Sequence, residues 1–463
     1  MKEVHSLAWV ILVAASAAYG CDVREGTDAE EYYFAAEKVA SMAECCTVCT
    51  TNPQCNYASF ATAGHAAGTC WLKDGKTMTP VNKSGVALVI VRAQPPGPVP
   101  PRPSPSPPAP PLPPPKYRVE LEEHSSKPVL SHGNAVGQGH SPCPLTFNPA
   151  YVPVAGGNTV GGVIVRTDGC NATKGALSFA KCDVQTGECN DLEPAYQING
   201  SQGTEDPRVV WDPYTEYFYN FAYGTDAKQS LADGCSTSGA PGAPGACTVI
   251  LSRSRTPYEA NSWEHVPGGT YPWHRNGCCV MAPVGQKSYC IFGESGNEGP
   301  GSGLGIAYTT NISSGKFTQT NWTGGVPGVG GSGPWMQPLG ASQEEIKLEA
   351  GTHIQTLSTG DLLHFYAAAT PGWVAHGNYT AGYIILDKDE PTKIIQRQSG
   401  QFFVPTYDYE TLCDGASDCP FSGERKNVIF ASSATPLGGD KFRLFFGGGD
   451  GNVGTAIVTV SLL

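Results

Sequence analysis

Two adjacent carboxylates, a proline and an arginine form the stretch of this chain best suited to chemistry: Glu205, Asp206, Pro207 and Arg208. An aromatic run, 217–223, follows and is typical of a buried β-strand. We therefore expect the tetrad where a loop enters a sheet, a place where catalytic groups are commonly displayed. Pro207 biases Asp206 toward extended backbone, and Arg208 can keep a neighbouring carboxylate ionised. The pattern indicates acid–base chemistry; an Asp/Arg pair that only braces a turn is the alternative.

Residues 116–463 contain the elements that would position these groups. Short strand-like runs recur between glycine-rich turns, for example 161–166, 209–223, 288–293 and 441–446, and no helical periodicity of useful length competes. So many short strands favour a β-propeller over a sandwich, which would end sooner. A propeller gathers polar side chains from several blades at the mouth of its channel. The candidates for one shared pocket are Asn148, Arg166, Asp206, Glu294, Glu349, His353 and Asp450.

The order of these motifs resembles glycoside hydrolase family 130, the five-bladed β-propeller enzymes that act on β-mannosides. The tetrad resembles that family's Glu-Asp-Pro-Arg motif. The flanking matches, in the family's order, are Phe147-Asn148-Pro149-Ala150, the strand that ends at Arg166, Tyr383 to Asp387 with Pro391, Tyr409-Glu410 with Asn427 to Phe430, and Phe445 to Asp450. The resemblance covers residues 143–463 and is poor between 225 and 350. It implies a mainly β protein with a five-bladed β-propeller; the cysteine-rich segment ahead of it is expected to form a small disulfide-rich α+β domain.

The resemblance also implies roles for individual side chains. Asp206 matches the family's general acid, which there acts through a sugar hydroxyl. Asn148, Arg166 and Asp450 match the sugar subsite, where they would fix the ring by hydrogen bonds. The further substrate-binding candidates are Glu205, Arg208, His353 and Tyr366.

The chain departs from the family's phosphorylases at two positions. Those enzymes place an arginine after a strand resembling 289–292 and a histidine after a tyrosine resembling Tyr366, where this chain has Gly293-Glu294 and Ala367. Basic side chains hold phosphate, whereas a carboxylate repels it, so we expect water as the attacking group. Glu294 is the first candidate for the general base and Glu349 the second.

The expected function is therefore an inverting glycoside hydrolase that acts on β-mannosides or a related cell-wall or glycoprotein glycan, without a metal or other cofactor. Two alternatives remain. One is a catalytically silent, lectin-like matrix protein that binds carbohydrate, and the other is a mannoside phosphorylase.

Residues 1–20 have the pattern of a cleaved secretory signal peptide. Lys2 precedes an apolar run from Leu7 to Ala18, and Ala18-Tyr19-Gly20 forms a small-x-small exit. A membrane anchor is the alternative, but the run is too short to span a bilayer. We expect a secreted protein of the extracellular space, cell wall or matrix. Six sequons fit glycosylation on that route, at Asn82, Asn171, Asn199, Asn311, Asn321 and Asn378.

The 17 cysteines indicate disulfides, as expected outside the cytosol, and their odd number leaves at least one thiol without an internal partner. Zinc at the Cys46-x-x-Cys49 pair is a minor alternative. The candidates for disulfide bonds are Cys21, Cys45, Cys49, Cys55, Cys70, Cys182, Cys189, Cys413 and Cys419. Of these, Cys182 with Cys189 and Cys413 with Cys419 are expected to pair locally, since each pair brackets a short loop.

Residues 21–92 are expected to form the first folded unit, with a short helix over 41–49 and a strand over 55–60. The spacing of Cys45, Cys49 and Cys55, with a later Cys-Trp-Leu-Lys, resembles the PAN/apple domain, a module that binds proteins or carbohydrate in its family. A folded spacer is the alternative. Because a core this small is marginal, disulfides should supply part of the stability.

A proline-rich linker, residues 93–115, separates that unit from the propeller at 116–463. Most positions from Pro95 to Pro115 are proline, which predicts a polyproline II rod. Its Ser-Pro core resembles hydroxyproline-rich segments of plant and green-algal wall glycoproteins. The net charge of −12, with scattered basic residues, argues against nucleic acid or an anionic membrane as the partner and leaves carbohydrate as the expected ligand.

A rod between two folded units predicts a protease-sensitive connection. Limited proteolysis of the secreted protein should cut between residues 93 and 116 and leave two stable fragments, detected by mass spectrometry. A single resistant fragment that contains both units would contradict this division.

Overall fold

The computed structural model describes residues 21–29, 35–51, 55, 57–61, 69–73, 80–91, 115–132, 139–141, 145–168, 176–196, 198, 202–225, 249–271, 276–293, 303–319, 335–339, 345–370, 379–411 and 427–463. The chain divides into two compact units, Met1–Pro111 and Leu112–Leu463. The predicted signal peptide and residues 93–114 of the linker lie outside the described residues, as do Glu294, Cys413, Cys419, Asn171, Asn199, Asn321 and Asn378. Across the described segments, no helix has the length and apolarity to cross a membrane.

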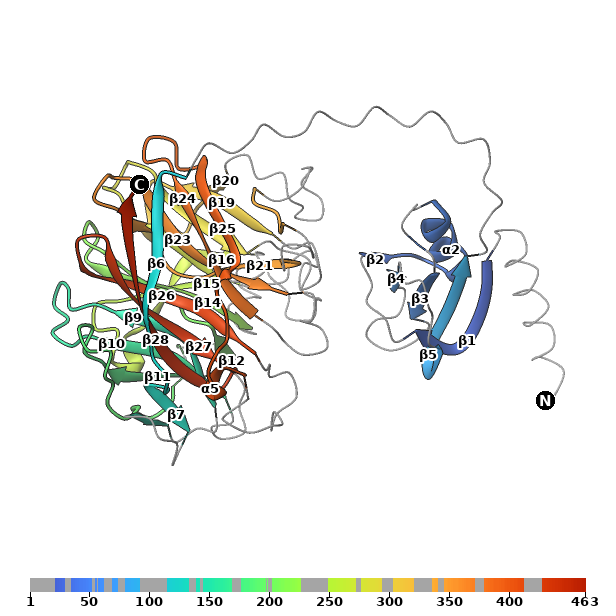
Figure 1. The fold of residues 1–463 in the computed structure, drawn as a ribbon, viewed down its shortest axis with the longest axis horizontal. Helices are drawn as coiled ribbons and strands as arrows, with labels where there is room; N and C mark the ends of the chain where they lie inside the picture. Colours follow the sequence, from blue (N-terminus) through green and yellow to red (C-terminus); the bar gives the residue numbers. More distant parts are fainter. Residues whose placement is uncertain are drawn as a thin grey trace. The chain divides into compact units, whose positions relative to one another are not determined.

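The described residues of the first unit form a five-stranded sheet, in the strand order β1-β5-β3-β4-β2, and the helix α2 (Figure 1). Its elements are β1 (Cys21–Ala29), β2 (Ala35–Lys38), α2 (Met42–Thr51), β3 (Tyr57–Ala61), β4 (Thr69–Lys73) and β5 (Pro80–Val91). The helix and the strand expected after it are both present. Of the predicted sites in this unit, Asn82 and Cys21 lie in strands whose backbone alone is described.

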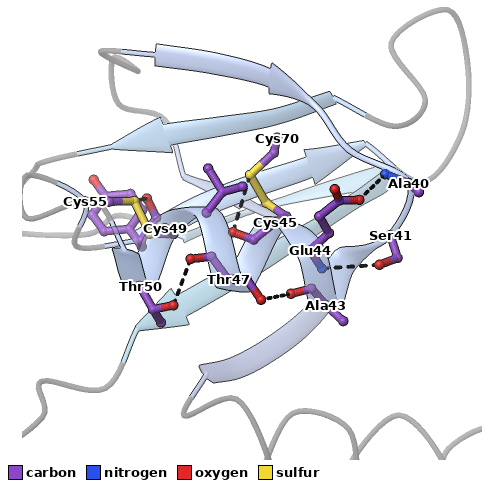
Figure 2. Close-up of a disulfide and its surroundings, with 12 residues drawn as sticks. Ala40, Ser41, Ala43, Glu44, Cys45, Thr47, Cys49, Thr50, Cys55 and Cys70 are labelled. Carbon is purple, nitrogen blue, oxygen red and sulfur yellow. Dashed lines mark hydrogen bonds between the residues drawn. A yellow bond between two sulfur atoms is a disulfide. The ribbon is translucent and has the colours of Figure 1, made fainter.

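Disulfides hold the helix of the first unit, and Figure 2 shows two of them. Cys45 bonds Cys70 on β4, and Cys49 bonds Cys55 just before β3. Because Cys49 is oxidised, the Cys46-x-x-Cys49 pair lacks the two thiolates that zinc would need. Buried cysteines thus connect two successive turns of the helix to the rest of a unit too small for a large apolar core.

The start of α2 is capped by its own side chains. Ser41 Oγ accepts a hydrogen bond from Glu44 N (3.2 Å), and Glu44 Oε2 accepts one from Ala40 N (2.6 Å). This is a variant of the capping box, in which a hydroxyl and a carboxylate satisfy backbone N–H groups that the helix leaves free.

The second unit is a propeller of five sheets, or blades, whose strands pair antiparallel except for the parallel pair β7–β8 (Figure 1). Blade one contains β9 (Leu145–Val152), β10 (Gly162–Asp168) and β11 (Ala176–Lys181); blade two contains β12 (Gln202–Glu205), β13 (Val209–Asp212), β14 (Tyr217–Thr225), β15 (Val249–Ser254) and β16 (Glu264–Tyr271). Blade three contains β17 (Gly277–Val280), β18 (Ser288–Gly293), β19 (Leu304–Thr309) and β20 (Thr318–Gln319); blade four contains β21 (Lys347–Ala350), β22 (Gln355–Thr356), β23 (Leu362–Ala369), β24 (Tyr379–Leu386) and β25 (Ile394–Phe403). Blade five contains β26 (Ile429–Gly438), β27 (Lys441–Gly448) and β28 (Asn452–Leu462), joined by β6 (Tyr117–His124), β7 (Leu130–His132) and β8 (Gly139–Ser141). The short helices η2 (Ala260–Ser262), η3 (Ile312–Ser314) and α5 (Asp408–Thr411) lie in connections.

Apolar side chains fill the spaces between successive blades. Phe221 of blade two packs edge-on against Phe292 of blade three, with ring centroids 6.0 Å apart. The first strand of each blade takes the inner position next to its neighbours; Tyr151 N on β9, for example, donates to Ser433 Oγ on β26 (3.0 Å). Loops at the ends of these inner strands therefore meet around the central axis.

One expected strand proved to be a hairpin. The run 209–223 divides into β13 and β14 because a turn over 212–216 reverses the chain. Asp212 Oδ1 accepts from Tyr214 N (3.1 Å), Asp212 Oδ2 accepts from Thr215 Oγ1 (2.6 Å), and Glu216 adopts a φ of 54°. Aromatic residues on both sides of this turn mask it in the sequence. The signal that could have revealed it is Asp212, because aspartate is a common turn residue.

The disulfides in the described part of the propeller are local. The structure joins Cys182 with Cys189, the pair that the spacing singled out, and Cys279 with Cys290 on the paired strands β17 and β18. The loop closed by the first bond docks on blade five, where Arg443 donates from Nε to Val184 O (2.7 Å) and from NH2 to Gln185 O (2.7 Å). The disulfide thus shapes a contact between blades one and five.

The propeller is closed by its N-terminal strand. β6 pairs antiparallel with β28, so the first and last segments of the unit share blade five (Figure 1, cyan beside red). At the start of this strand, Tyr117 is anchored on blade four: its hydroxyl donates to Asp361 Oδ2 (2.5 Å), and its backbone N–H donates to Gln396 Oε1 (2.9 Å). Lys116 Nζ contacts the same carboxylate at 2.6 Å. The start of the unit is therefore attached to two blades.

Removing the Tyr117 anchor should destabilise the propeller. Tyr117→Ala deletes a fully buried ring and leaves Asp361 without its hydroxyl donor, so we expect a loss of about 3 to 5 kcal/mol in the free energy of unfolding. Urea unfolding followed by tryptophan fluorescence measures it. Arg118→Ala, at an exposed position one residue on, is the control and should change stability by less than about 1 kcal/mol. Equal effects of the two variants would contradict the anchoring role.

Candidate functional site

Arg208 crosses the central axis of the propeller. Its guanidinium is fully buried, and its Nε donates to the carbonyl oxygen of Gly351 (2.6 Å), which follows the inner strand of blade four. Its NH1 donates to Pro207 O (2.8 Å), and the guanidinium lies 5.3 Å from the ring centroid of Phe430 on the inner strand of blade five. A side chain that starts in blade two and contacts blades four and five must span the channel.

Blade three completes the surroundings of Arg208 through Asn276. With its amide oriented by its hydrogen-bond partners, Asn276 donates from nitrogen to Asp206 O (3.0 Å) and accepts at oxygen from Arg208 NH2 (3.2 Å). Burial lowers the pKa of Arg208, and the Cys278 thiol and the negative charges of Asp206 and Glu349 oppose that shift. Carboxylates of blades two and four therefore both act on one buried guanidinium.

Asp206 is fully buried where blade two meets blade one. Its Oδ1 accepts hydrogen bonds from Asn148 Nδ2 on β9 (2.7 Å) and from Arg166 NH1 on β10 (3.3 Å). Arg166 also lies 2.9 Å from Glu205 Oε2 and stacks over the Phe147 ring at 4.7 Å. Two adjacent carboxylates thus both contact the guanidinium of Arg166.

The backbone around these groups is strained. Asn148 and Asp206 both have a φ of 50°, Asn276 has 55° and Asp450 has 47°, in the left-handed region that non-glycine residues rarely adopt. The expectation that Pro207 holds Asp206 in extended geometry was wrong, because contacts with Asn148 and Asn276 from neighbouring blades fix the residue instead. Strain of this kind persists only where surrounding structure enforces it, and it clusters at functional sites.

Glu349 lies in a second buried polar cluster, between blades four and five. Its Oε1 is 2.5 Å from Lys347 Nζ and accepts a hydrogen bond from the Tyr379 hydroxyl (2.7 Å). Lys347 and Glu349 are both only 2 % exposed. The second candidate base is therefore a carboxylate paired with a lysine, on the inner strand of its blade.

Two neutral histidines lie in the interior of blade four. Cys279 N donates to His353 Nδ1 (2.9 Å), which places the proton of this ring on Nε2, and His364 Nδ1 donates to Thr352 O (2.7 Å). Burial lowers the pKa of His353 to about 4 and that of His364 to about 3. Burial likewise raises the pKa of the free thiol of Cys278 to about 12, so this cysteine is inert near neutral pH.

The predicted site residues divide into groups. Asn148, Arg166, Glu205 and Asp206 meet directly, and Arg208, His353 and Glu349 surround the axis beside them. Asp450 lies in the turn between β27 and β28, next to β9, where Thr146 N donates to Gly451 O (3.2 Å). Tyr366 lies apart, because its hydroxyl donates to Glu345 Oε1 (2.5 Å) within a cluster that also holds Arg397.

Sequence reasoning missed three residues of this centre: Asn276, Lys347 and Gly351. A Cβ on Gly351 would lie 2.3 Å from Phe365 O and 2.6 Å from Ala431 O, so only glycine lets the inner strands approach Arg208 this closely. The Lys-x-Glu pair could have been noticed, since residues two apart on a strand share a face. Among the described residues, no group of three or more His, Cys, Asp or Glu side chains is placed to hold a metal ion.

Comparisons with known proteins agree with this architecture. Residues 23–73 match the PAN domain family. The chain is similar in structure to a glycosyl hydrolase from Bacteroides ovatus, with 17 % sequence identity and a TM-score of 0.50 over 74 % of this chain and 94 % of that one. It is equally similar, at 16 % identity, a TM-score of 0.50 and the same coverage, to a structure reported for the GH130 family of mannoside phosphorylases, which contains glycoside hydrolases that target β-1,2 mannosidic linkages in Candida mannan. In sequence, no curated protein matches.

The low pKa values of His353 and His364 predict acid sensitivity. Between pH 6.5 and about 4 the unfolded chain binds protons at these histidines and the folded chain does not, so stability is fully present above pH 6.5 and decreases as pH falls. The slope should approach about 1.4 kcal/mol per pH unit for each histidine. Urea unfolding of His364→Gln from pH 7 to 5 should show a smaller slope than the wild type. His265→Gln, at a half-buried position on β16, is the control; a slope unchanged in both variants would contradict the assignment.

Proposed function

We propose that this protein is an extracellular glycoside hydrolase that acts with inversion on β-mannosides or a related cell-wall or glycoprotein glycan. The observation that carries the proposal is Asp206: a buried carboxylate at a strained backbone position, held by Asn148 and Arg166 from the neighbouring blade. Burial of the carboxylate and strain of its backbone both cost free energy, and its neighbours fix its direction. The five-bladed fold, shared with glycoside hydrolases, supports the choice of reaction.

Asp206 is proposed as the general acid. Glu205 and Asp206 are adjacent carboxylates that both contact Arg166, and repulsion between two like charges favours retention of one proton by the pair. Asp206 is fully buried, which fits a proton that passes through a sugar hydroxyl rather than directly to the leaving oxygen. Arg208 fixes the tetrad by its bonds to Pro207 and Gly351.

The general base is proposed to be a carboxylate on the other side of the axis. Glu349 is ionised beside Lys347 and, like Asp206, acts electrostatically on Arg208. Inversion requires two carboxyl groups about 6.5 to 9.5 Å apart, with room for a water between the base and the sugar. Glu294, which follows β18, stays a candidate for the same role.

The sugar at the cleavage point is proposed to bind where blades five, one and two meet. Asn148 and Arg166 already donate to Asp206, and Asp450 stands in the adjacent turn. Hydrogen bonds from fixed polar groups reject a wrong epimer, because the unmatched group would stay buried without a partner. His353 is an internal support in this scheme.

Water, rather than phosphate, is proposed as the nucleophile. The three basic side chains described around the axis are already engaged: Arg166 by two carboxylates, Lys347 by Glu349, and Arg208 by backbone carbonyls. Phosphate would have to displace these partners. Secretion is supported by the leader-like segment 1–20 and the disulfides, and the PAN unit is proposed to bind a protein or glycan near the substrate.

Substitution of the carboxylates tests the proposal. Asp206→Asn should lower turnover of manno-oligosaccharides by about 100-fold or more while sugar binding persists, as loss of a general acid does. Glu349→Gln and Glu294→Gln distinguish the two candidate bases by the same criterion, and Asp389→Asn, at an exposed position, is the control.

Turnover is measured with and without phosphate. Stimulation by phosphate would identify a phosphorylase, and sugar binding without turnover in the wild type would identify a lectin-like protein. Full activity of Asp206→Asn would rule out the assigned acid.

A further inference from the structure

Lys347, Glu349 and Tyr379 form a buried cluster with more mutual contacts than a simple ion pair has. Lys347 Nζ, Glu349 Oε1 and the Tyr379 hydroxyl form a closed triangle with separations of 2.5, 2.7 and 3.3 Å. The lysine and glutamate project from the same face of β21, while Leu348 and Ala350 on the opposite face pack into the core between blades three and four. The strand therefore aims both charges into the space between blades four and five.

Stability alone does not account for this cluster. A buried ion pair pays a desolvation cost that commonly exceeds its attraction, and apolar residues of similar volume often serve as well or better. Here apolar neighbours are available, since Val428 and Phe430 pack around the Tyr379 ring. A charged pair in such surroundings is better explained by a requirement for the ionised carboxylate.

Tyr379 restricts the orientation of that carboxylate. Its hydroxyl donates to the same oxygen that Lys347 contacts, so both donors act on Glu349 Oε1 from different directions. Two donors on one oxygen fix the rotation of the carboxyl group and favour its charged form. The carboxylate of Glu349 also acts electrostatically on Arg208, which lies on the axis, and this links the cluster to the site of Asp206.

We propose that Lys347 and Tyr379 are positioning residues of the hydrolytic reaction, which hold Glu349 ionised and in one orientation so that it can take a proton from the attacking water. The inference rests on the proposed function and extends it. In the step it describes, the water oxygen bonds to the anomeric carbon as the glycosidic C–O bond breaks. Glu349 takes the proton of the water, and the leaving oxygen receives a proton that originates at Asp206.

The pH dependence of kcat/KM tests this role, because a merely structural pair would not move it. Removal of the ammonium in Lys347→Met should shift the acid limb of the profile to higher pH by about 1 to 3 units, since a nearby cation favours the ionised carboxylate by that amount. Tyr379→Phe, which removes only one hydrogen bond, should shift it in the same direction by less. Lys347→Arg should restore most of the wild-type profile.

The matched control is Lys393→Met, which breaks an exposed Lys–Asp pair of the same blade and should leave the profile unchanged. Should Lys347→Met fail to fold, the profile of Tyr379→Phe decides. Turnover with an unmoved acid limb in the folded variants, or wild-type rates in Glu349→Gln, overturns this inference alone. Absence of turnover by the wild-type protein on every manno-oligosaccharide overturns the proposed function and the inference with it.

Discussion

The buried guanidinium of Arg208 is the contact on which the centre of this propeller depends. It reaches from blade two to the carbonyl of Gly351 in blade four and over Phe430 in blade five, and Asn276 joins it from blade three. A charge with no exposed surface is tolerated only when its donors are satisfied and opposite charges lie near. The inner strands meet those requirements with backbone carbonyls and two carboxylates, and in doing so they must approach one another closely.

That requirement explains the other features of the site. Gly351 has no side chain because carbonyl oxygens of blades four and five already occupy the space around its Cα. Asn148, Asp206 and Asn276 take left-handed backbone conformations because their side chains must reach between blades. Each of these costs free energy locally, and the apolar packing between blades offsets it. The interior is therefore organised for polar contact at the axis and for burial further out.

The two units of the chain solve the problem of stability by different means. The PAN unit attaches helix α2 to its sheet with disulfides, as small extracellular domains do. The propeller relies on large interfaces between blades and on closure by β6, with Tyr117 clamped between Asp361 and Gln396. In the described part of the propeller, disulfides shape single hairpins and loops. One of them is the Cys182–Cys189 loop of blade one, whose Val184 carbonyl accepts a hydrogen bond from Arg443.

The sequence by itself determined the class of fold and the principal motif. Strand-like runs between turns, the cysteine spacing near the N-terminus and the Glu205-to-Arg208 tetrad are local patterns, and local patterns report backbone preference and burial. The roles of Asn276, Lys347 and Gly351 were decided only by the tertiary structure, because each depends on a partner in another strand or blade. The φ of Asp206 is the clearest case: proline chemistry favours one conformation at this position, and hydrogen bonds from blades one and three impose another. Tyr366 is a residue that the sequence placed at the site and the tertiary structure placed elsewhere. Its hydroxyl contacts Glu345 and Arg397, whose positions in other strands no local pattern reports.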